Sequence, residues 1–287
     1  MNCIACASNK VDPLFSLKEN SAYTVYGCHD CGLEFLYPQP DLKTLDMIYN
    51  GDYYGSRGIK DNYENVKRMK QATFSWIIDK IKKYKKEGKL LDIGCATGFF
   101  MDIAEKKGFD VYGVDISKEA VKKAQSLFGE HKVFNSSIDD FNIKDKFDVI
   151  IMTDLLEHVF DPSKTLHQVK SFLNPGGILV VLSPDAGSFS RKLMKKYRMQ
   201  FKLEHLYYFT DKSILSLSQN NGYNLIYNCV GIKKINFAYL FGQSKVYKLP
   251  IISYLIKFIN FILPKSLKNH NFTMKFGEKL WILQKPF

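Results

Sequence analysis

The segment Leu90-Leu-Asp-Ile-Gly-Cys-Ala-Thr-Gly-Phe-Phe100 constrains the fold more than any other stretch of the chain. A short apolar run with an acidic residue leads into a glycine turn and then into a helical pattern. Gly94 lets the chain turn sharply off a strand, and Gly98 lets the next helix pack close to the sheet. The segment therefore predicts a strand, a loop and a helix whose backbone comes close to a ligand. It lacks the third glycine of a dinucleotide fingerprint and the Gly-Lys-Ser/Thr ending of a P-loop.

A second predicted strand also ends in an acidic residue. Phe109–Asp115 is apolar for most of its length, and Asp115 closes it. Asp115 follows Asp92 by about the separation at which α/β nucleotide-binding folds place a ribose-binding acid. Two acidic strand ends that flank a glycine loop are more specific than the loop alone. The alternative is that both carboxylates only cap the following helices.

The remaining apolar segments predict a mostly parallel sheet. Phe147–Met152 and Gly177–Leu182 have the composition of buried parallel strands, and Pro162–Leu173 between them has apolar residues at helical spacing. Lys279–Gln284 is predicted to form the last strand. Strands that alternate with helices predict an α/β fold with a doubly wound, Rossmann-like sheet. In such folds the ligand crevice lies at the carboxyl ends of the strands.

The glycine loop between two acidic strand ends resembles the cofactor loop of class I S-adenosylmethionine-dependent methyltransferases. The resemblance extends over residues 62–230. It implies S-adenosylmethionine as the cofactor and the methyltransferase sheet as the fold. It also implies a set of cofactor-binding residues: Asp92 for the methionine ammonium, Asp115 for the ribose, Gly94, Cys95 and Gly98 in the loop, Ile116 as an apolar platform for adenine, and Thr153 after the fourth strand.

One position departs from the pattern of that class. After the third strand, its members usually carry an acid that holds the adenine amine. Ser137 occupies this position here, Ile138 follows it, and Asp139 stands one residue further along. The resemblance therefore implies an adenine contact at Ser137 and Ile138 without the usual acid.

Two histidines are candidates for the catalytic base. A hydroxyl acceptor must be oriented and must lose its proton during methyl transfer. Glu157 and His158 follow the fourth predicted strand, and an imidazole has the pKa of a general base near neutral pH, while Glu157 could hold a metal or orient a partner. His205 is the rival base, in a segment, Glu204–Thr210, that resembles one in methyltransferases associated with polysaccharide and sugar modification. The alternatives are a structural Glu157–His158 pair and a core histidine at 205.

Four of the six cysteines form two Cys-x-x-Cys pairs near the N-terminus. Cys3 and Cys6 are one pair, and Cys28 and Cys31 are the other. Four thiolates complete the tetrahedral shell of a structural zinc ion, and a segment of this size is too small to fold on its apolar core alone. We expect a zinc ribbon with short strands between the pairs. The alternatives are two disulfides or four thiols without a role.

Neither the net charge nor the C-terminal region identifies the methyl acceptor. The chain carries 41 Lys and Arg against 29 Asp and Glu, a net charge of +12, which favours acidic partners such as nucleic acid, anionic lipid or a nucleotide-linked substrate. Lysine is spread along the whole chain, however, so a general compositional bias explains the excess equally well.

Residues 249–264 form an apolar run, too short to span a bilayer, that could lie on a membrane surface or form a buried lid or dimer contact. With no signal-peptide pattern, we expect a cytoplasmic protein, with a peripheral contact at the inner membrane surface as an option.

These patterns predict four parts of the chain: a zinc ribbon at 1–37, a linker or flap at 38–61, the methyltransferase core at 62–230, and a C-terminal insertion with the last strand at 231–287. The leading hypothesis is methylation of a sugar, glycan or other small-molecule hydroxyl, on an acceptor that could be nucleotide- or lipid-linked. An RNA methyltransferase is one rival, although the ribbon lacks the interleaved basic and aromatic residues of a nucleic-acid reader. A catalytically silent adaptor that keeps the fold is the other.

Overall fold

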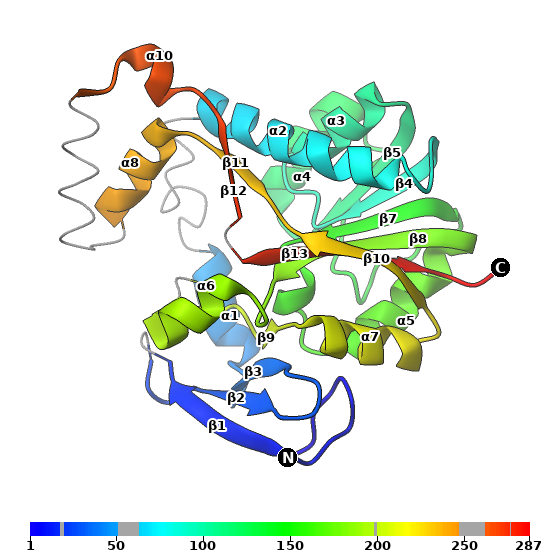
Figure 1. Ribbon diagram of the computed structural model, residues 1–287. Coiled ribbons are helices and arrows are strands. Elements are labelled where there is room, and N and C mark those ends of the chain that lie inside the picture. The colour runs from blue at the N-terminus through cyan, green and yellow to red at the C-terminus, as the bar shows by residue number, and fades with distance from the viewer. Residues whose placement is uncertain (18–19, 51–62, 198–199, 247–261, 276) are drawn as a thin grey trace. The chain divides into compact units, whose positions relative to one another are not determined.

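The computed structural model describes residues 1–17, 20–50, 63–197, 200–246, 262–275 and 277–287 (Figure 1). Within them the chain divides into two compact units. One unit comprises Met1–Pro40, Ile78–Gly231 and Gly277–Phe287, and the other comprises Asp41–Ile77 and Ile232–Phe276. The first unit contains the glycine loop, both candidate bases and the four N-terminal cysteines.

A seven-stranded sheet forms the centre of the first unit, in the order β10-β13-β8-β7-β4-β5-β6. Its strands are β4 (Gly88–Ile93), β5 (Phe109–Asp115), β6 (Val133–Asn135), β7 (Phe147–Thr153), β8 (Leu173–Pro184), β10 (Asn224–Val230) and β13 (Glu278–Gln284). The strands from β8 to β6 pair in parallel, and β13 runs antiparallel to both of its neighbours. The predicted α/β, Rossmann-like sheet is confirmed, including the last strand at 279–284.

Helices cover both faces of this sheet, with α3 and α4 on one face and α5 and α7 on the other (Figure 1). Their bounds are α3 (Phe99–Lys106), α4 (Lys118–Phe128), α5 (Pro162–Phe172) and α7 (Asp211–Asn220). Asp161 caps α5 by accepting a hydrogen bond from the Lys164 amide, and Pro162 occupies the first turn, where no amide donor is needed. Thr210 and Ser213 form a capping box at the start of α7.

The strands that carry the site are apolar because both of their faces are covered. The β7 residues Val149, Ile150, Ile151 and Met152 are all fully buried. The strand β8 is irregular over residues 174–177, because Phe147 pairs with Leu173 whereas Val149 pairs with Ile178. Burial on two faces explains why these strands appear in the sequence as continuous apolar runs rather than alternating ones.

A four-stranded sheet at the N-terminus has the order β1-β2-β3-β9. Its strands are β1 (Val11–Ser16), β2 (Thr24–Cys28), β3 (Glu34–Tyr37) and β9 (Tyr207–Tyr208). We call residues 1–37 the N-terminal ribbon. The sequence predicts the first two strands, whereas β3 and its partner β9, which comes from the region after β8, are features of the tertiary structure. Short helical segments follow β7 and β8: η2 (Leu156–His158), α6 (Phe189–Met194) and η3 (Lys195–Tyr197).

The second unit has its own small core. It contains α1 (Leu42–Asn50), most of α2 (Tyr63–Ile81), β11 (Lys233–Ile235), α8 (Phe237–Val246), α10 (Lys265–Lys268) and β12 (Phe272–Met274). Val66, Met69 and Ile235 pack together, and the side-chain amides of Asn65 and Asn236 bind each other. Of the linker or flap predicted at 38–61, residues 38–50 are described and include the helix α1, whereas residues 51–61 lie outside the described residues. Residues 249–261 of the predicted apolar run also lie outside them. Among the described helices, none combines the length and apolar character needed to cross a membrane.

Two glycines at the ends of α3 allow a matched test of why position 98 holds glycine. Gly98 and Gly108 have φ angles of +82° and +93°, which side chains rarely adopt. A Cβ at position 98 would lie 2.6 Å from Phe128 Cε2, whereas nothing lies within 4 Å of one at position 108. We expect Gly108→Ala to lower the free energy of unfolding by about 1–2 kcal/mol through backbone strain, and Gly98→Ala by about 2–5 kcal/mol because overpacking adds to it. Urea unfolding of both variants measures the difference, and equal losses would contradict the packing role of Gly98.

Candidate functional site

The glycine loop joins β4 to α3 and is tied to the neighbouring strand. Gly94 has a φ of +80°, and a Cβ there would lie 3.4 Å from Leu155 Cδ1. The amides of Gly94 and Cys95 both donate to the carbonyl of Val114 in β5, at 2.8 and 3.2 Å. The loop is therefore held at the carboxyl ends of β4 and β5, as the sequence predicts.

Asp115, at the end of β5, anchors the turn of the loop. Its Oδ2 accepts a hydrogen bond of 2.9 Å from the Ala96 amide, and its Oδ1 accepts one of 2.8 Å from the Ser117 amide. The residue that caps α4 is Ser117, and Gly98 stands at the start of α3, so the alternative that the two acids cap these helices is wrong. A carboxylate has about four acceptor positions, which leaves Asp115 able to bind hydroxyl groups as well.

The turn after Asp115 presents an apolar side chain to solvent. Ile116 is 62% exposed, as a platform for a planar ligand requires. The side-chain amide of Asn135, at the end of β6, donates to the carbonyls of both Asp115 and Ile116 at 3.0 Å. The sequence analysis overlooked Asn135, although its position at the carboxyl end of a predicted parallel strand is the signal that could have found it.

Asp92 is a buried acid in β4 with an unused acceptor. The residue is 2% exposed, and among the residues that the structure describes none forms a hydrogen bond with its Oδ1. Burial, with a smaller contribution from the negative charge of Asp115, raises the pKa of Asp92 to about 8. A cation placed against Oδ1 would reverse this effect by stabilising the carboxylate.

The four remaining predicted cofactor contacts differ in their surroundings. Cys95 is buried with its thiol close to Gly113, and burial raises its pKa, which disfavours the reactive thiolate. The hydroxyl of Ser137 donates to Asp140 Oδ2 at 2.6 Å and accepts from the Asp140 amide. Ile138 packs against the core. Thr153 is the last residue of β7, the strand that neighbours β4.

The two candidate bases lie side by side. The imidazole rings of His158 and His205 have centroids 4.7 Å apart and meet edge to face. Glu157 lies with them, and one potential ligand atom from each of the three residues falls within 4.8 Å of the others. The sequence presents the two histidines as rivals, whereas the structure brings them into one cluster at the carboxyl end of β7. Such a set can share a proton or hold a divalent cation.

Glu157 is fully buried inside this cluster. Its Oε2 accepts a hydrogen bond of 2.9 Å from the hydroxyl of Ser183 in β8, and no group in the described part of the chain binds its Oε1. Burial is the main reason that the pKa of Glu157 is raised well above its usual range, and the charges of Asp154 and Glu278 raise it further. This shift favours the protonated form, in which the carboxyl group can donate a hydrogen bond. The sequence analysis overlooked Ser183, whose place near the carboxyl end of β8 could have indicated it.

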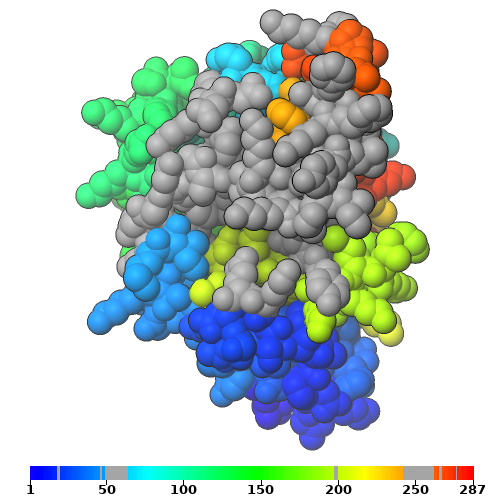
Figure 2. Space-filling model, turned by 90° about the vertical axis from the view of Figure 1, so that its left-hand side faces the viewer, coloured from blue at the N-terminus to red at the C-terminus, as the bar shows by residue number. Residues whose placement is uncertain are grey.

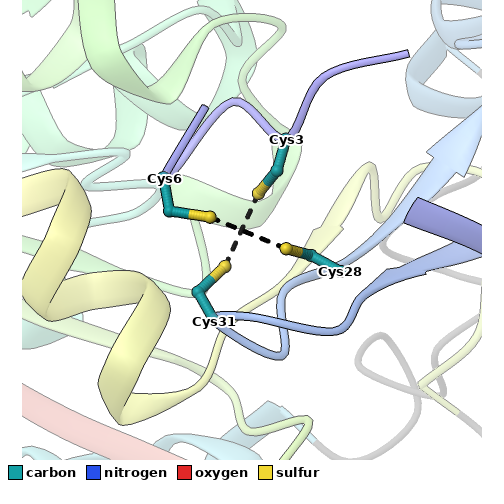
Figure 3. Close-up of side chains that lie close together, drawn as sticks. All are labelled: Cys3, Cys6, Cys28 and Cys31. Atoms are coloured by element: carbon teal, nitrogen blue, oxygen red, sulfur yellow. Dashed lines mark hydrogen bonds between the residues drawn. The ribbon is translucent and has the colours of Figure 1, made fainter. Parts of the chain in front are cut away.

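The four N-terminal cysteines converge on one point (Figure 3). Their sulfur atoms all lie within 4.8 Å of one another, with 3.5 Å between Cys3 and Cys31 and 3.6 Å between Cys6 and Cys28. All four are free thiols, and these distances far exceed the disulfide bond length of about 2.05 Å. The two-disulfide alternative is therefore wrong. A hydrogen bond from Cys31 lowers the pKa of the Cys3 thiol.

Comparison with known proteins extends this description. The family model described as a methyltransferase domain matches residues 67–228. A ubiquinone biosynthesis O-methyltransferase of Aeromonas salmonicida is 22% identical over 214 residues, which covers 70% of this chain and 88% of that protein. Its counterpart in Actinobacillus pleuropneumoniae is 33% identical over 101 residues, or 32% of this chain and 43% of that protein.

Solved structures agree on the fold. The magnesium protoporphyrin IX methyltransferase of Synechocystis, with S-adenosylhomocysteine bound, superposes with a TM-score of 0.53 at 15% identity, covering 85% of this chain and 100% of that one. The methyltransferase from Bacillus halodurans gives 0.52 at 15% identity, with 74% and 99% covered. Because the family model spans more than half of the chain, the chain belongs to the methyltransferase-domain family, and it is an S-adenosylmethionine-dependent methyltransferase.

Proposed function

We propose that this protein transfers a methyl group from S-adenosylmethionine to a hydroxyl of a sugar, a glycan or another small molecule. The observation that carries the proposal is the His158–His205 cluster at the carboxyl end of β7. The strand β7 pairs with β4, which leads into the glycine loop. A base is thus available on the strand next to the expected cofactor site.

The residues around the glycine loop fit the cofactor. The unpartnered Oδ1 of buried Asp92 suits the ammonium of the methionine moiety. Asp115 has spare acceptor positions for ribose hydroxyls, and exposed Ile116 suits the adenine ring. The hydroxyl of Ser137 is engaged by Asp140, so we assign the adenine edge to backbone groups near Ile138 rather than to an acid. When bound, the cofactor supplies an activated methyl group on a sulfonium.

The acceptor side has a base and a hydrogen-bond donor. We assign His158 as the group that accepts the hydroxyl proton, with the ring of His205 packed edge to face against it. The buried carboxyl group of Glu157, whose protonated form is favoured, donates from Oε1 to the acceptor oxygen and so orients it. The named activities of the curated relatives support an oxygen acceptor. The resemblance of the segment 204–210 to sugar-associated methyltransferases supports a sugar or glycan.

We also propose that the four cysteines bind one structural zinc ion. A tetrahedral site with Zn–S bonds of about 2.3 Å separates its sulfur atoms by about 3.8 Å, close to the 3.5 and 3.6 Å found here. Four thiolates fill the coordination shell, so the metal would stabilise the ribbon rather than take part in methyl transfer.

Binding of S-adenosylhomocysteine should depend on pH through Asp92. Below its pKa of about 8, the acid is protonated and must lose that proton to bind an ammonium. The affinity should therefore rise between pH 6 and 7.5, by up to about tenfold per pH unit. Asp92→Asn should weaken binding by about 10- to 100-fold and abolish the pH dependence. Isothermal titration measures both, and pH-independent binding by the wild type would contradict the assigned role.

The two histidines should differ in their effect on turnover. A general base contributes about 10²- to 10⁴-fold to the rate, so His158→Ala should lower kcat by that amount and His205→Ala by less. The rates are measured on an acceptor identified by screening nucleotide sugars and lipid-linked glycans with radiolabelled S-adenosylmethionine. Unchanged S-adenosylhomocysteine affinity in both variants is the control. A larger loss for His205→Ala would reverse the assignment.

Purified protein should contain one zinc ion per chain. Cys28→Ser should lose it, because a hydroxyl is a poor replacement for a thiolate ligand. Cys229→Ser is the matched control, since Cys229 is a partly buried free thiol in β10, outside the cluster. Metal analysis by mass spectrometry distinguishes the two variants, and an equal zinc content in both would refute the four-cysteine site.

A further inference from the structure

Leu206 joins the N-terminal ribbon to the turn that carries the candidate base. Its amide donates to the carbonyl of Glu157 at 2.8 Å, and its carbonyl accepts from the amide of Leu36 at 2.9 Å. Leu206 itself is fully buried. A series of main-chain hydrogen bonds therefore connects Leu36 in the ribbon, through Leu206 beside His205, to Glu157 beside His158.

The short strand β9 depends on the ribbon for its pairing. It contains only two residues, and its register is Glu34 with Tyr208 and Phe35 with Tyr207. An isolated pair of residues does not form a stable strand, so β3 supplies the frame that holds this segment extended. The hydroxyl of Thr210 adds a bond of 2.6 Å to the carbonyl of Cys31, within the second cysteine pair.

A partly buried ion pair connects the ribbon to the segment after β8. Arg191 of α6 binds Glu34 of β3 through Nε at 2.9 Å and through Nη2 at 2.8 Å, and both side chains are at most 13% exposed. The guanidinium also lies over the rings of Phe15 and Phe201. Figure 2 shows the ribbon, in dark blue, against this yellow-green segment. A bidentate, partly desolvated pair of this kind fixes orientation as well as adding stability.

We infer that the N-terminal ribbon is a positioning module for the acceptor side of the site, which sets the placement of His205 and His158 through β3, Leu206 and Glu157. The inference rests on the proposed function and deepens it. The cofactor side is built separately, because the glycine loop takes its hydrogen bonds from β5 and from Asp115. The state of the four cysteines is thus coupled to the bases and not to the cofactor loop.

The test compares zinc-loaded protein with protein stripped by a chelator, both saturated with S-adenosylhomocysteine. Amide hydrogen exchange followed by NMR should show at least about tenfold faster exchange at Leu36 and Leu206 after zinc removal. The imidazole Cε1–H signals of His158 and His205 should shift, because their ring contact changes. The amides of Leu91 in β4 and Ile151 in β7 should change by less than about twofold, and the ligand affinity should be kept.

Glu34→Gln provides a second variant that keeps all four cysteines. It removes the charge that binds Arg191 and should reproduce the faster exchange at Leu206 and the histidine shifts in part, with the metal content unchanged. Glu119→Gln is its control, since Glu119 is an exposed residue of α4 that pairs with Lys123. This comparison remains informative if the cysteines hold no zinc.

Three results would overturn the inference. Faster exchange at Leu36 with no change at Leu206 or the histidines would make the ribbon an independent module. Equal loss of protection at Leu91 and Ile151 would reduce the effect to global stability. Unchanged histidine signals in Glu34→Gln would exclude the route through β3. Failure of the loaded protein to bind S-adenosylhomocysteine would refute the proposed function instead, and the exchange data on ligand-free protein would still decide the coupling.

Discussion

Parallel pairing of β4 with β5 on one side and β7 on the other is the constraint on which the rest of the site depends. All three strands end at the same edge of the sheet, so the residues that follow them meet there although they are far apart in sequence. The glycine loop, Asp115 and the turn with Glu157 and His158 are placed in this way. The pairing is maintained by side chains that are apolar on both faces, which leaves little freedom for a change of register.

Two buried acids, Asp92 and Glu157, lie at this edge of the sheet and have different proposed roles. Asp92 is buried in β4, no described residue forms a hydrogen bond with its Oδ1, and under the proposed function the ammonium of the cofactor binds there. Glu157 is fully buried near the charges of Asp154 and Glu278, and these surroundings favour its neutral form although the hydrogen bond from Ser183 favours the charged one. Carboxyl groups are costly to bury without a complete set of partners, so their retention at neighbouring strand ends is a physical sign of function rather than of packing.

The ribbon is continuous with the core rather than attached to it by a linker alone. Three of its four cysteines and Leu33 belong to the same apolar cluster as Leu206, Tyr207 and Phe209. Its sheet is completed by β9, and the Glu34–Arg191 pair closes the side of that junction. The ribbon completes its sheet with β9, a strand from the core, so a loss of order in the ribbon also weakens the pairing that holds β9. This shared pairing is the physical basis of the inferred coupling to His205.

The sheet, the glycine loop, both acidic strand ends and the grouping of the four cysteines could be predicted from the sequence alone. Each of these follows from a local pattern: an apolar run, a glycine at a turn, or a fixed spacing between thiols. Three features became visible only in the tertiary structure: His158 and His205 share one cluster, Glu157 is buried against Ser183, and β9 pairs with the ribbon. The two histidines lie more than forty residues apart, and their meeting depends on β9 pairing with β3. Two residues of strand have no periodicity from which such long-range pairing can be predicted, because its energy comes from the partner strand and not from the segment itself.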